Sequence, residues 1–324
     1  MIRNETVKDE ISAFAKAKVS FGDLSLFGDI QVRSTNMTLA PDYGFIGVAQ
    51  QGDIAKHWTF INPKIGVNYH WDLKWEAYAS FGRTGREPTR VDILGGFQLN
   101  ASNLDLARSD AFEPEFVNDL ETGFRYTGQM LALNINYFYM DFENEIAPYG
   151  EVIAFGVQKR TNIKDSYRTG VELDGTYHLT EQLKLTSSIT YMTSQIKQLE
   201  DETSGETLTD VSAILTPEWT YSASLAYKPV DGLGFTFSGR GISESYMDIS
   251  NDEAYVLPAY FVTAFRVNYT YKVATLSLEA NNLFDDAYYT NGSPVDVDFD
   301  GAIDGPGYYI NAGRNYFATL KVKF

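Results

Sequence analysis

Apolar and polar residues alternate along most of this chain. In residues 131–139, Leu, Leu, Ile, Tyr and Tyr occupy the odd positions, while Ala, Asn, Asn and Phe occupy the even ones. Segments 171–178, 183–191 and 221–228 show the same pattern. A period of two gives an extended strand one apolar face, and no comparable stretch has a period near 3.6. The sequence therefore predicts an all-β protein.

The connections between the predicted strands differ in length in a regular way. Short turns such as Thr127-Gly128-Gln129 alternate along the chain with long polar connections. In an antiparallel meander this places all the long loops at one end. This asymmetry is typical of a transmembrane antiparallel β-barrel, and a sandwich has no reason to show it. The expected strands are 7–20, 22–35, 56–70, 72–83, 113–127, 129–145, 160–178, 182–197, 213–228, 233–245, 257–271, 273–283 and 311–324. The expected long loops are 36–55, 84–112, 146–160, 198–212, 246–256 and 285–310.

The composition agrees with a barrel wall. Aromatic residues make up 15% of the chain, yet the mean hydropathy is −0.25. Only every second residue of a barrel strand meets lipid, so such a chain stays polar on average. Aromatics near the strand ends, such as Trp71, Tyr126, Trp219 and Tyr316, would form girdles at the membrane interfaces. The alternative is that aromatic residues simply favour strands.

Charge and cysteine content exclude several classes of protein. The formal net charge of −17 argues against nucleic-acid binding, which needs a basic surface. The chain has no Cys, which excludes disulfides, zinc–thiolate sites and thiol nucleophiles within it. No run of about 18 apolar residues predicts a transmembrane helix. Met1 does not open the charged-then-apolar pattern of a signal peptide.

Four stretches carry a resemblance to a known family. They are GDIQVR at 28–33, ASFGRTGREPTR at 79–90, FEPE leading into LETGFRY at 112–126, and NNLFDDAYY at 281–289. The final strand also ends on an aromatic residue, Phe324. Over essentially its whole length the chain resembles the C-terminal part of the β-barrel of a TonB-dependent outer-membrane receptor, of a kind common in Bacteroidetes.

The resemblance implies a particular architecture. Such receptors carry a signal peptide, a TonB-contacting box, a globular plug and then a plugged barrel of 22 strands. This sequence contains about 13 of the 22 strands, so residues 1–324 are expected to be the C-terminal portion of the barrel, with plug and signal peptide absent. An odd number of strands cannot close in the usual antiparallel way. We therefore expect a fragment of a gene or an incomplete assembly.

The resemblance also implies a place and a function. The expected location is the outer membrane of a Gram-negative bacterium, in contact with its lipid. The expected function is energy-coupled uptake of a scarce nutrient through the TonB system, with a ferric siderophore as the expected ligand. A passive pore and a carbohydrate or vitamin import receptor of the same family remain alternatives. An enzyme is not expected, because a hydrolytic triad needs His beside Ser and an acid, and only His57 lies on the long-loop side.

Candidate ligand-binding residues lie in the outer loops. Arginines at the head of a long loop suit the capture of an anionic iron chelate, and tyrosines can stack on a ligand. These candidates are Arg83, Arg86, Arg90, Tyr246, Tyr255, Tyr288, Tyr289, Tyr308 and Tyr309. A second set is expected to face the lumen, either holding a plug by polar contacts or simply wetting the wall. It comprises Glu121, Arg125, Glu172, Asp174, Lys184, Arg240, Arg266 and Glu279.

One acidic segment is a candidate calcium site. Asp296, Asp298, Asp300 and Asp304 place carboxylates at alternate positions around Gly301, as at the start of a calcium loop. The twelfth position is Gly307 instead of the usual bidentate Glu. A hydrated acidic loop is the preferred interpretation, and no other cofactor is expected.

Overall fold

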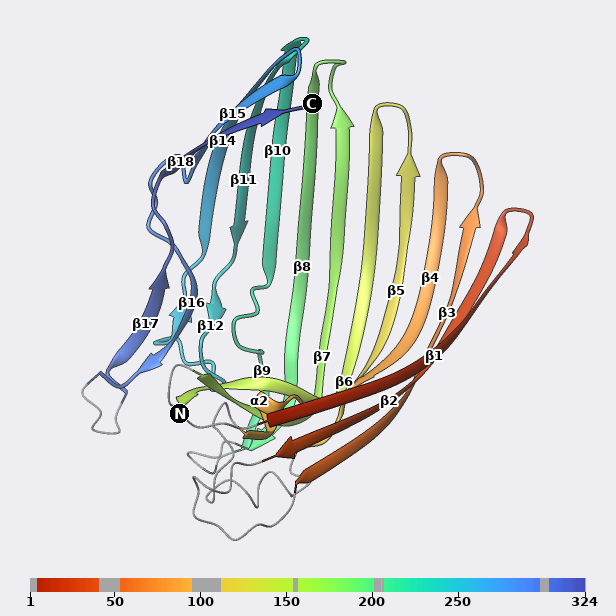
Figure 1. The fold of residues 1–324 in the computed structure, drawn as a ribbon, viewed down its shortest axis with the longest axis vertical. Helices are drawn as coiled ribbons and strands as arrows, with labels where there is room; N and C mark the ends of the chain where they lie inside the picture. The colour runs from red at the N-terminus through yellow and green to blue at the C-terminus, as the bar shows by residue number, and fades with distance from the viewer. Residues whose placement is uncertain are drawn as a thin grey trace.

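A single antiparallel sheet of 14 strands forms most of the protein (Figure 1). The computed structural model describes residues 5–40, 53–94, 112–153, 157–200, 205, 207–297 and 303–323, apart from the side chains of 149–153, 157–159 and 200. Neighbours in the sheet follow the order of the chain, and β9 (Thr207–Val211) pairs with β8 outside that path. The path consists of β1 (Glu5–Phe21), β2 (Leu24–Ala40), β3 (Ile54–His70), β4 (Trp75–Arg86), β5 (Glu115–Thr127), β6 (Leu131–Ile153), β7 (Val157–His178), β8 (Leu183–Glu200), β10 (Trp219–Val230), β11 (Leu233–Ile242), β14 (Tyr260–Tyr271), β15 (Ala274–Asn281) and β18 (Asn315–Val322).

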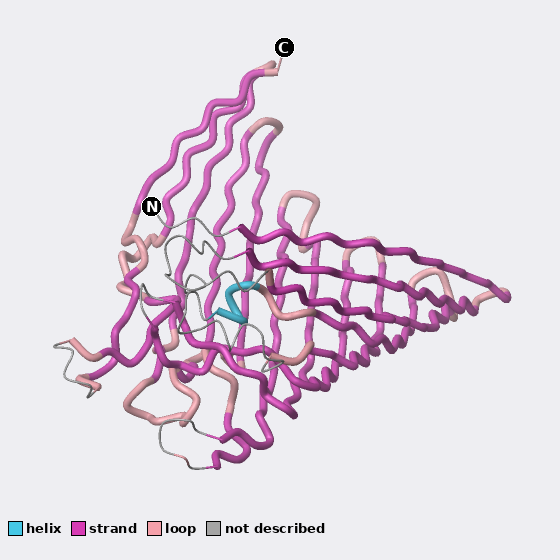
Figure 2. The backbone as a smooth tube through the Cα atoms, turned by 60° about the horizontal axis from the view of Figure 1, so that its bottom comes forward, coloured by secondary structure: helices cyan, strands magenta, loops and turns pink. Residues whose placement is uncertain are grey.

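The sheet is strongly curved and open. Figure 2 shows the strands near the two termini as separate arms of one wall. Within the part of the chain that the structure describes, β1 and β18 are the edge strands and do not pair with each other. The predicted antiparallel meander, with each predicted strand in its place along the path, is confirmed, while closure of the barrel is not seen in these residues.

The two ends of the sheet differ (Figure 1). At one end, the turn end, consecutive strands are joined by turns of two to four residues, such as Gly22-Asp23 and Asp231-Gly232. Gly22 and Gly232 have φ angles of 59° and 82°, which glycine adopts without strain. At the opposite end, the loop end, lie the longer connections and the short helix α2 (Arg90–Leu94).

The two faces of the sheet also differ. Large apolar side chains stand exposed on one face, and the register places Ile135, Leu173, Ile189 and Tyr221 in one row across β6, β7, β8 and β10. A row of this kind is unfavourable in water and suits a hydrocarbon surface. The opposite, concave face carries the polar residues of the same strands. None of the helices in the described residues has the length and apolar character needed to cross a membrane.

The buried apolar cores lie at the loop end. One cluster joins Met37, Leu39 and Ile54 of β2 and β3 to Ile93 and Leu94 of α2. A second cluster joins the loop-end parts of β6, β7 and β8 to the segment that follows β9 and to the connection between β12 (Ser245–Tyr246) and β13 (Val256–Leu257). It comprises Ala147, Ile163, Ile196, Leu199, Ala213, Ile214 and Ile249. These contacts extend the wall beyond the exposed apolar face and fix the loop end in place.

Several predicted loops contain strands. The loop predicted at 146–160 is wrong, because β6 and β7 continue as one hairpin whose residues Ile146 and Ile163 are buried. The segment 198–212 contains β9, which pairs with the end of β8. The predicted strand 213–228 begins only at Trp219, since Ala213 and Ile214 turn into the second core cluster.

Two short ribbons occupy the remaining connections at the C-terminal side. Segment 285–310 contains the paired strands β16 (Tyr289–Val295) and β17 (Gly305–Ile310), where one loop was predicted. Strands β12 (Ser245–Tyr246) and β13 (Val256–Leu257) pair at the two ends of the predicted loop 246–256. The terminal Phe324 lies outside the described residues, and the last strand ends at Val322.

The NNLFDD segment has a structural role at the end of β15. Asn282 is 5% exposed and has a φ of 48°. Its side-chain amide donates to the carbonyl oxygens of Asp286 and Ala312, at 2.8 and 3.4 Å, and its oxygen accepts the N–H of Asp286 at 3.0 Å. Asn282 therefore fastens the connection after β15 to the start of β18.

Candidate functional site

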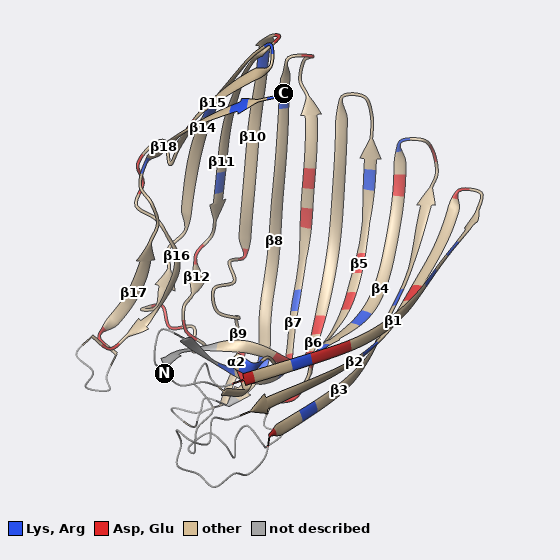
Figure 3. Cartoon of the chain, in the orientation of Figure 1, with Lys and Arg blue, Asp and Glu red and all other residues tan. Residues whose placement is uncertain are grey.

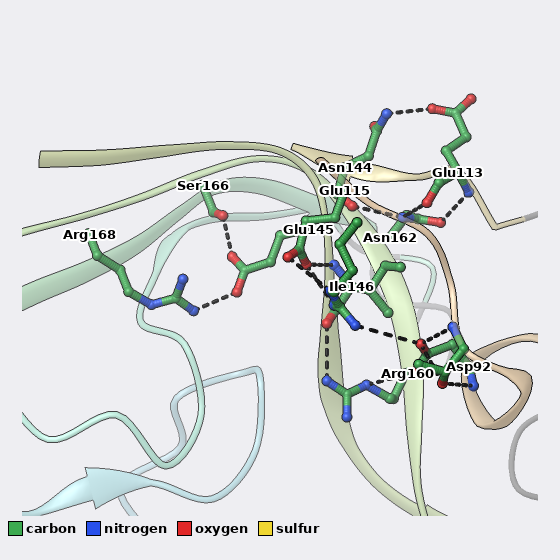
Figure 4. Close-up of polar contacts among 12 residues, drawn as sticks. Asp92, Glu113, Glu115, Asn144, Glu145, Ile146, Arg160, Asn162, Ser166 and Arg168 are labelled. Carbon is green, nitrogen blue, oxygen red and sulfur yellow. Dashed lines mark hydrogen bonds and ion pairs between the residues drawn. The ribbon is translucent and has the colours of Figure 1, made fainter. Parts of the chain in front are cut away.

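A polar network at the loop end ties α2 to the strands beside it (Figure 4). Asp92 is 4% exposed and accepts the backbone N–H and the hydroxyl of Thr89, both at 2.8 Å. Thr89 precedes the helix and its hydroxyl accepts the N–H of Asp92 at 3.3 Å, so the pair forms a capping box. The same carboxylate lies 3.2 Å from Arg160 Nε and 3.9 Å from Arg86 Nη1.

The network continues into the distal hairpin, which is the part of β6 and β7 that lies at the loop end, from Ile146 to Asn162. Arg86 also pairs with Glu115 at 2.9 Å, and Glu115 accepts the backbone N–H of Ile146 at 2.8 Å. Arg160 donates to the carbonyl oxygen of Ile146 at 3.1 Å. Figure 4 shows these groups converging from β5, β6, β7 and the α2 segment. Five chain segments, β4, β5, β6, β7 and the α2 segment, are thereby joined through the buried Asp92 and the half-buried Glu115.

A second buried carboxylate lies next to this group. Glu145 is 6% exposed and accepts hydrogen bonds from Ser166 and Arg168 of β7. Nearby, Asn162 donates to the carbonyl oxygens of Glu113 and Asn144, at 3.0 and 2.8 Å. The sequence analysis singled out Arg86 but did not identify Asp92, Arg160 or Glu145. The only local signal for any of them is the Thr-Arg-Val-Asp segment at 89–92, which has the spacing of a capping box.

A third buried carboxylate links the β4–α2 connection to β1 and β2. Glu87 is 4% exposed and pairs with Lys8 of β1 and with Arg33 of β2, the latter at 2.8 Å. Burial alone would raise the pKa of Glu87, but the hydrogen bond from Lys8, a backbone hydrogen bond and the charge of Arg33 outweigh it. The pKa of Glu87 therefore lies below its ordinary value of 4.5.

The lowered pKa of Glu87 predicts acid-sensitive docking of this connection. A carboxyl group whose pKa is lower in the folded state contributes stability above its unfolded pKa, and that contribution is lost as the pH falls through the folded pKa. We expect the stability of the wild-type protein to fall between pH 5 and pH 3, measured by urea unfolding in detergent micelles. Glu87→Gln should be about 2 kcal/mol less stable at pH 7 and show a flatter profile over that range.

Glu10 provides the matched control for this prediction. It also pairs with Arg33, at 3.3 Å, but its side chain is 40% exposed. Glu10→Gln should change stability by less than about 0.5 kcal/mol and keep the wild-type pH profile, because exposed ion pairs contribute little. A Glu87→Gln variant with the same slope between pH 5 and pH 3 as the wild type would contradict the role assigned to Glu87.

The three candidate arginines of the outer loop lie in different settings. Arg83 donates to Glu143 at 2.8 and 2.7 Å and lies 4.6 Å from the ring centroid of Phe116. Arg86 belongs to the Asp92 network, and the odd spacing between the two places them on opposite faces of β4. Arg90 opens α2, and its side chain has no hydrogen-bond or ion-pair partner among the described residues.

The candidate tyrosines gather on and beside the two short ribbons. Tyr289 and Tyr308 stack across β16 and β17 with centroids 4.7 Å apart, and Tyr288 lies 5.0 Å from Tyr260. Tyr308 donates to the carbonyl oxygen of Val256 at 3.1 Å, which joins this ribbon to β13. Tyr246 donates to Glu253, and Tyr255 and Met247 are bonded through their backbones. Tyr309 is on β17 and mostly exposed.

The candidate lumen residues lie on the concave face. Arg125 pairs with Glu76 at 3.2 Å, Glu172 accepts from Asn136 at 3.1 Å, and Arg266 pairs with Glu279 at 2.7 Å. Glu121 accepts from Ser80 at 3.5 Å and lies 4.0 Å from Lys64 Nζ. Figure 3 shows acidic residues on β7 and a basic one on β11 within this wall. Arg125, Asp174, Arg240 and Glu279 line one hollow of about 890 Å³.

The candidate calcium segment is described only in part. Asp298 and Asp300 lie outside the described residues, while Asp304 accepts the N–H of Val297 at 2.7 Å. Asp296 also has an interaction partner. Among the residues whose placement the structure gives, no group of three or more His, Asp or Glu is arranged to hold a metal ion. Calcium binding at Asp296, Asp298, Asp300 and Asp304 stays a prediction.

Comparison with known proteins identifies relatives of this chain. A family model described as "TonB dependent receptor-like, beta-barrel" matches residues 2–283. The ferric enterobactin receptor of Pseudomonas aeruginosa is 24% identical over 243 residues, which are 68% of this chain and 31% of that protein.

Solved structures share the fold. The copper transporter OprC superposes with a TM-score of 0.75 at 17% identity, covering 98% of this chain and 48% of that one. The ferric-catecholate import receptor Fiu of Escherichia coli K12 gives 0.73 at 19% identity, covering 99% and 45%. The ferric citrate transporter FecA gives 0.73 at 18% identity, covering 99% and 46%. This chain thus spans less than half the length of each of these relatives.

Proposed function

We propose that this chain, which belongs to the TonB-dependent receptor β-barrel family, forms part of a receptor that imports a scarce nutrient, with a ferric siderophore as its ligand. The family places the chain in the outer membrane of Gram-negative bacteria, and its members are receptors and transporters, not enzymes. In this proposal the energy for uptake comes from the TonB system of the inner membrane. The bacterial group of origin stays a prediction.

The observation that carries the proposal is the family match over residues 2–283. The names of several relatives support iron as the cargo: a ferric enterobactin receptor, a ferric-catecholate import receptor and a ferric citrate transporter. A copper transporter has the same fold, so the fold alone does not select iron. At these identities the choice of a siderophore rests on the frequency of iron chelates among the named relatives.

The geometry of the loop end fits a binding role. The Asp92–Arg160 ion pair and the hydrogen bond from Ile146 N–H to Glu115 hold α2 and the loop-end part of β6 and β7 in place. Strand β16, whose Tyr289 stacks on Tyr308, contacts β6 at this end. Arg90 carries a positive charge at this end with no carboxylate partner among the described residues. Aromatic rings and arginine side chains suit an anionic aromatic chelate.

Nutrient uptake by cells that lack and regain the gene tests the proposal. We expect uptake of radioactive iron from ferric enterobactin or ferric citrate to fall at least about tenfold in a deletion strain and to return with the gene. Uptake should also stop when the TonB protein is removed. Uptake that persists without TonB would indicate a passive pore and overturn the proposal. Loss of cyanocobalamin or oligosaccharide uptake, with iron uptake intact, would overturn the siderophore assignment and retain the family function.

A further inference from the structure

A row of polar residues crosses the concave face of the sheet. The register of the strands places successive members of this row directly beside one another, from β4 through to β11. The row consists of Glu76, Arg125, Asn134, Asp174, Ser188, Ser222 and Arg240. Residues that lie directly opposite each other on neighbouring strands point to the same face of a sheet, so all seven side chains lie on the concave face. The row is therefore a polar belt that runs across seven strands.

The two arginines of this belt differ in their partners. Arg125 is engaged by Glu76 at 3.2 Å and lies 4.1 Å from the ring centroid of Tyr78. The side chain of Arg240 has neither a hydrogen bond nor an ion pair with any residue that the structure describes. Two acidic residues line the hollow that Arg240 lines, Asp174 and Glu279, and Glu279 accepts hydrogen bonds from Arg266 at 2.9 and 2.7 Å. The charge of Arg240 is thus unneutralised by the described wall.

Hydroxyl groups lie near Arg240 on its own strand β11, on the adjacent strand β10 and on β8 beyond it. Ser222 pairs with it directly, and Ser188 follows Ser222 in the same row. Ser224 and Ser238 pair with each other in the next row toward the turn end, and all four line the hollow of about 890 Å³. Serine hydroxyls can donate to an anion without bringing a negative charge. Asp174 lies three strand spacings away, about 14 Å, so it does not neutralise this region.

We propose that Arg240, with the hydroxyls of Ser188, Ser222 and Ser238, is a binding subsite for a carboxylate group of a solute on the concave face. The guanidinium supplies the charge and two parallel N–H donors that match a carboxylate, and the serines supply further donors. The hollow that contains the subsite is also lined by Tyr288, one of the candidate tyrosines, whereas Arg83 and Arg86 lie at the loop end of β4 and Arg90 opens α2. As a step in import it rests on the proposed function, but anion binding at Arg240 can be measured without transport.

The absence of cysteine from the chain allows the subsite to be probed by thiol labelling. Ser222→Cys places one thiol next to Arg240, to be labelled in isolated outer membranes by an anionic and by a cationic methanethiosulfonate reagent. We expect the ratio of anionic to cationic labelling rates to fall about tenfold when Arg240→Gln is added, from Coulomb interaction over about 5–6 Å in water. Arg125→Gln is the matched control and should leave the ratio unchanged within about twofold, because Glu76 neutralises that residue.

Succinate is the probe for occupancy. It should slow anionic labelling of the Ser222→Cys thiol in a saturable way, and Arg240→Gln should abolish that protection. A labelling ratio unaffected by Arg240→Gln, or protection that persists in that variant, would overturn the subsite. A thiol unreactive toward both reagents would also overturn it, since polypeptide and not a free solute would then fill the hollow. Labelling as expected in a strain with no iron uptake would leave the subsite intact and refute only the proposed cargo.

Discussion

A Gly123→Ala variant is expected to lose about 3 kcal/mol of folding stability and to assemble poorly, although the change adds a single methyl group. A Cβ atom on Gly123 would lie 2.3 Å from the carbonyl oxygen of Ile135 and 2.6 Å from the hydroxyl oxygen of Tyr78. The carbonyl belongs to the neighbouring strand β6, so relief requires a shift of the paired backbones. Tyr78 crosses β5 at this glycine to donate to Asn136 at 2.8 Å.

Two further glycines, Gly82 and Gly170, serve as comparison positions for this prediction. Gly82 lies on the same face of the adjacent strand β4, and a Cβ there would have neighbours at 3.5 Å, an ordinary contact distance. Gly82→Ala should therefore be neutral, or more stable by up to about 1 kcal/mol, because alanine restricts the unfolded chain. Gly170→Ala should behave like Gly123→Ala, since its Cβ would lie 2.3 Å from the carbonyl oxygen of Tyr191. Urea midpoints and heat-modifiable mobility on gels measure the difference, and equal midpoints for the variants at 123 and 82 would refute the argument.

The sheet could be predicted from sequence because its signal is local. Alternation in segments such as 131–139 and 183–191 follows from one face meeting an apolar surface and the other a polar one. Each strand therefore carries its own evidence, and the short turns at one end give the order of neighbours. Glycines within strands, such as Gly123, can be noticed in the sequence. What they accommodate, here the ring of Tyr78, depends on a neighbouring strand and cannot be read locally.

The partners of the loop-end charges could not be predicted because they depend on register between distant segments. Arg83 and Glu143 are 60 residues apart, and nothing in either local sequence marks them as a pair. The sequence analysis assigned Arg83, Arg86 and Arg90 a common role as ligand contacts. The structure shows Arg83 and Arg86 already bonded to carboxylates on opposite faces of β4, and Arg90 without such a partner among the described residues.

The ribbons at the loop end escaped prediction for a related reason. Strands β16 and β17 are rich in Gly, Pro, Ser and Asn, which usually mark loops. They are held by tertiary contacts: Tyr289 stacks on Tyr308, and the sulfur of Met247 packs so close to Gly292 that a Cβ there would lie 2.3 Å from it. Met247 is fully buried there. The stability of such short ribbons comes from packing against other segments and not from their own propensity.

An Asp92→Ala variant is expected to release α2 from the strands, with a cost of about 3 kcal/mol for that segment. The change removes the capping box with Thr89. It also removes the carboxylate that lies close to both Arg160 and Arg86. The side chain of Asp92 is only 3% exposed, so the loss is not compensated by water as it would be on the surface. Ile93 and Leu94 would then leave their buried contacts with Met37 and Leu39.

Tryptic cleavage after Arg90 measures this release, because a protease cuts a docked segment only when it opens. A cost of about 3 kcal/mol increases the open population, and hence the cleavage rate, about 100-fold. Asp165→Ala is the matched control: Asp165 pairs with Lys197 at 2.8 Å at the same end of β7, but both side chains are about half exposed. That exposed pair should contribute less than about 0.5 kcal/mol, so cleavage at Arg90 should stay near the wild-type rate. Similar cleavage rates in the two variants would show that burial of Asp92 does not hold α2 against the wall.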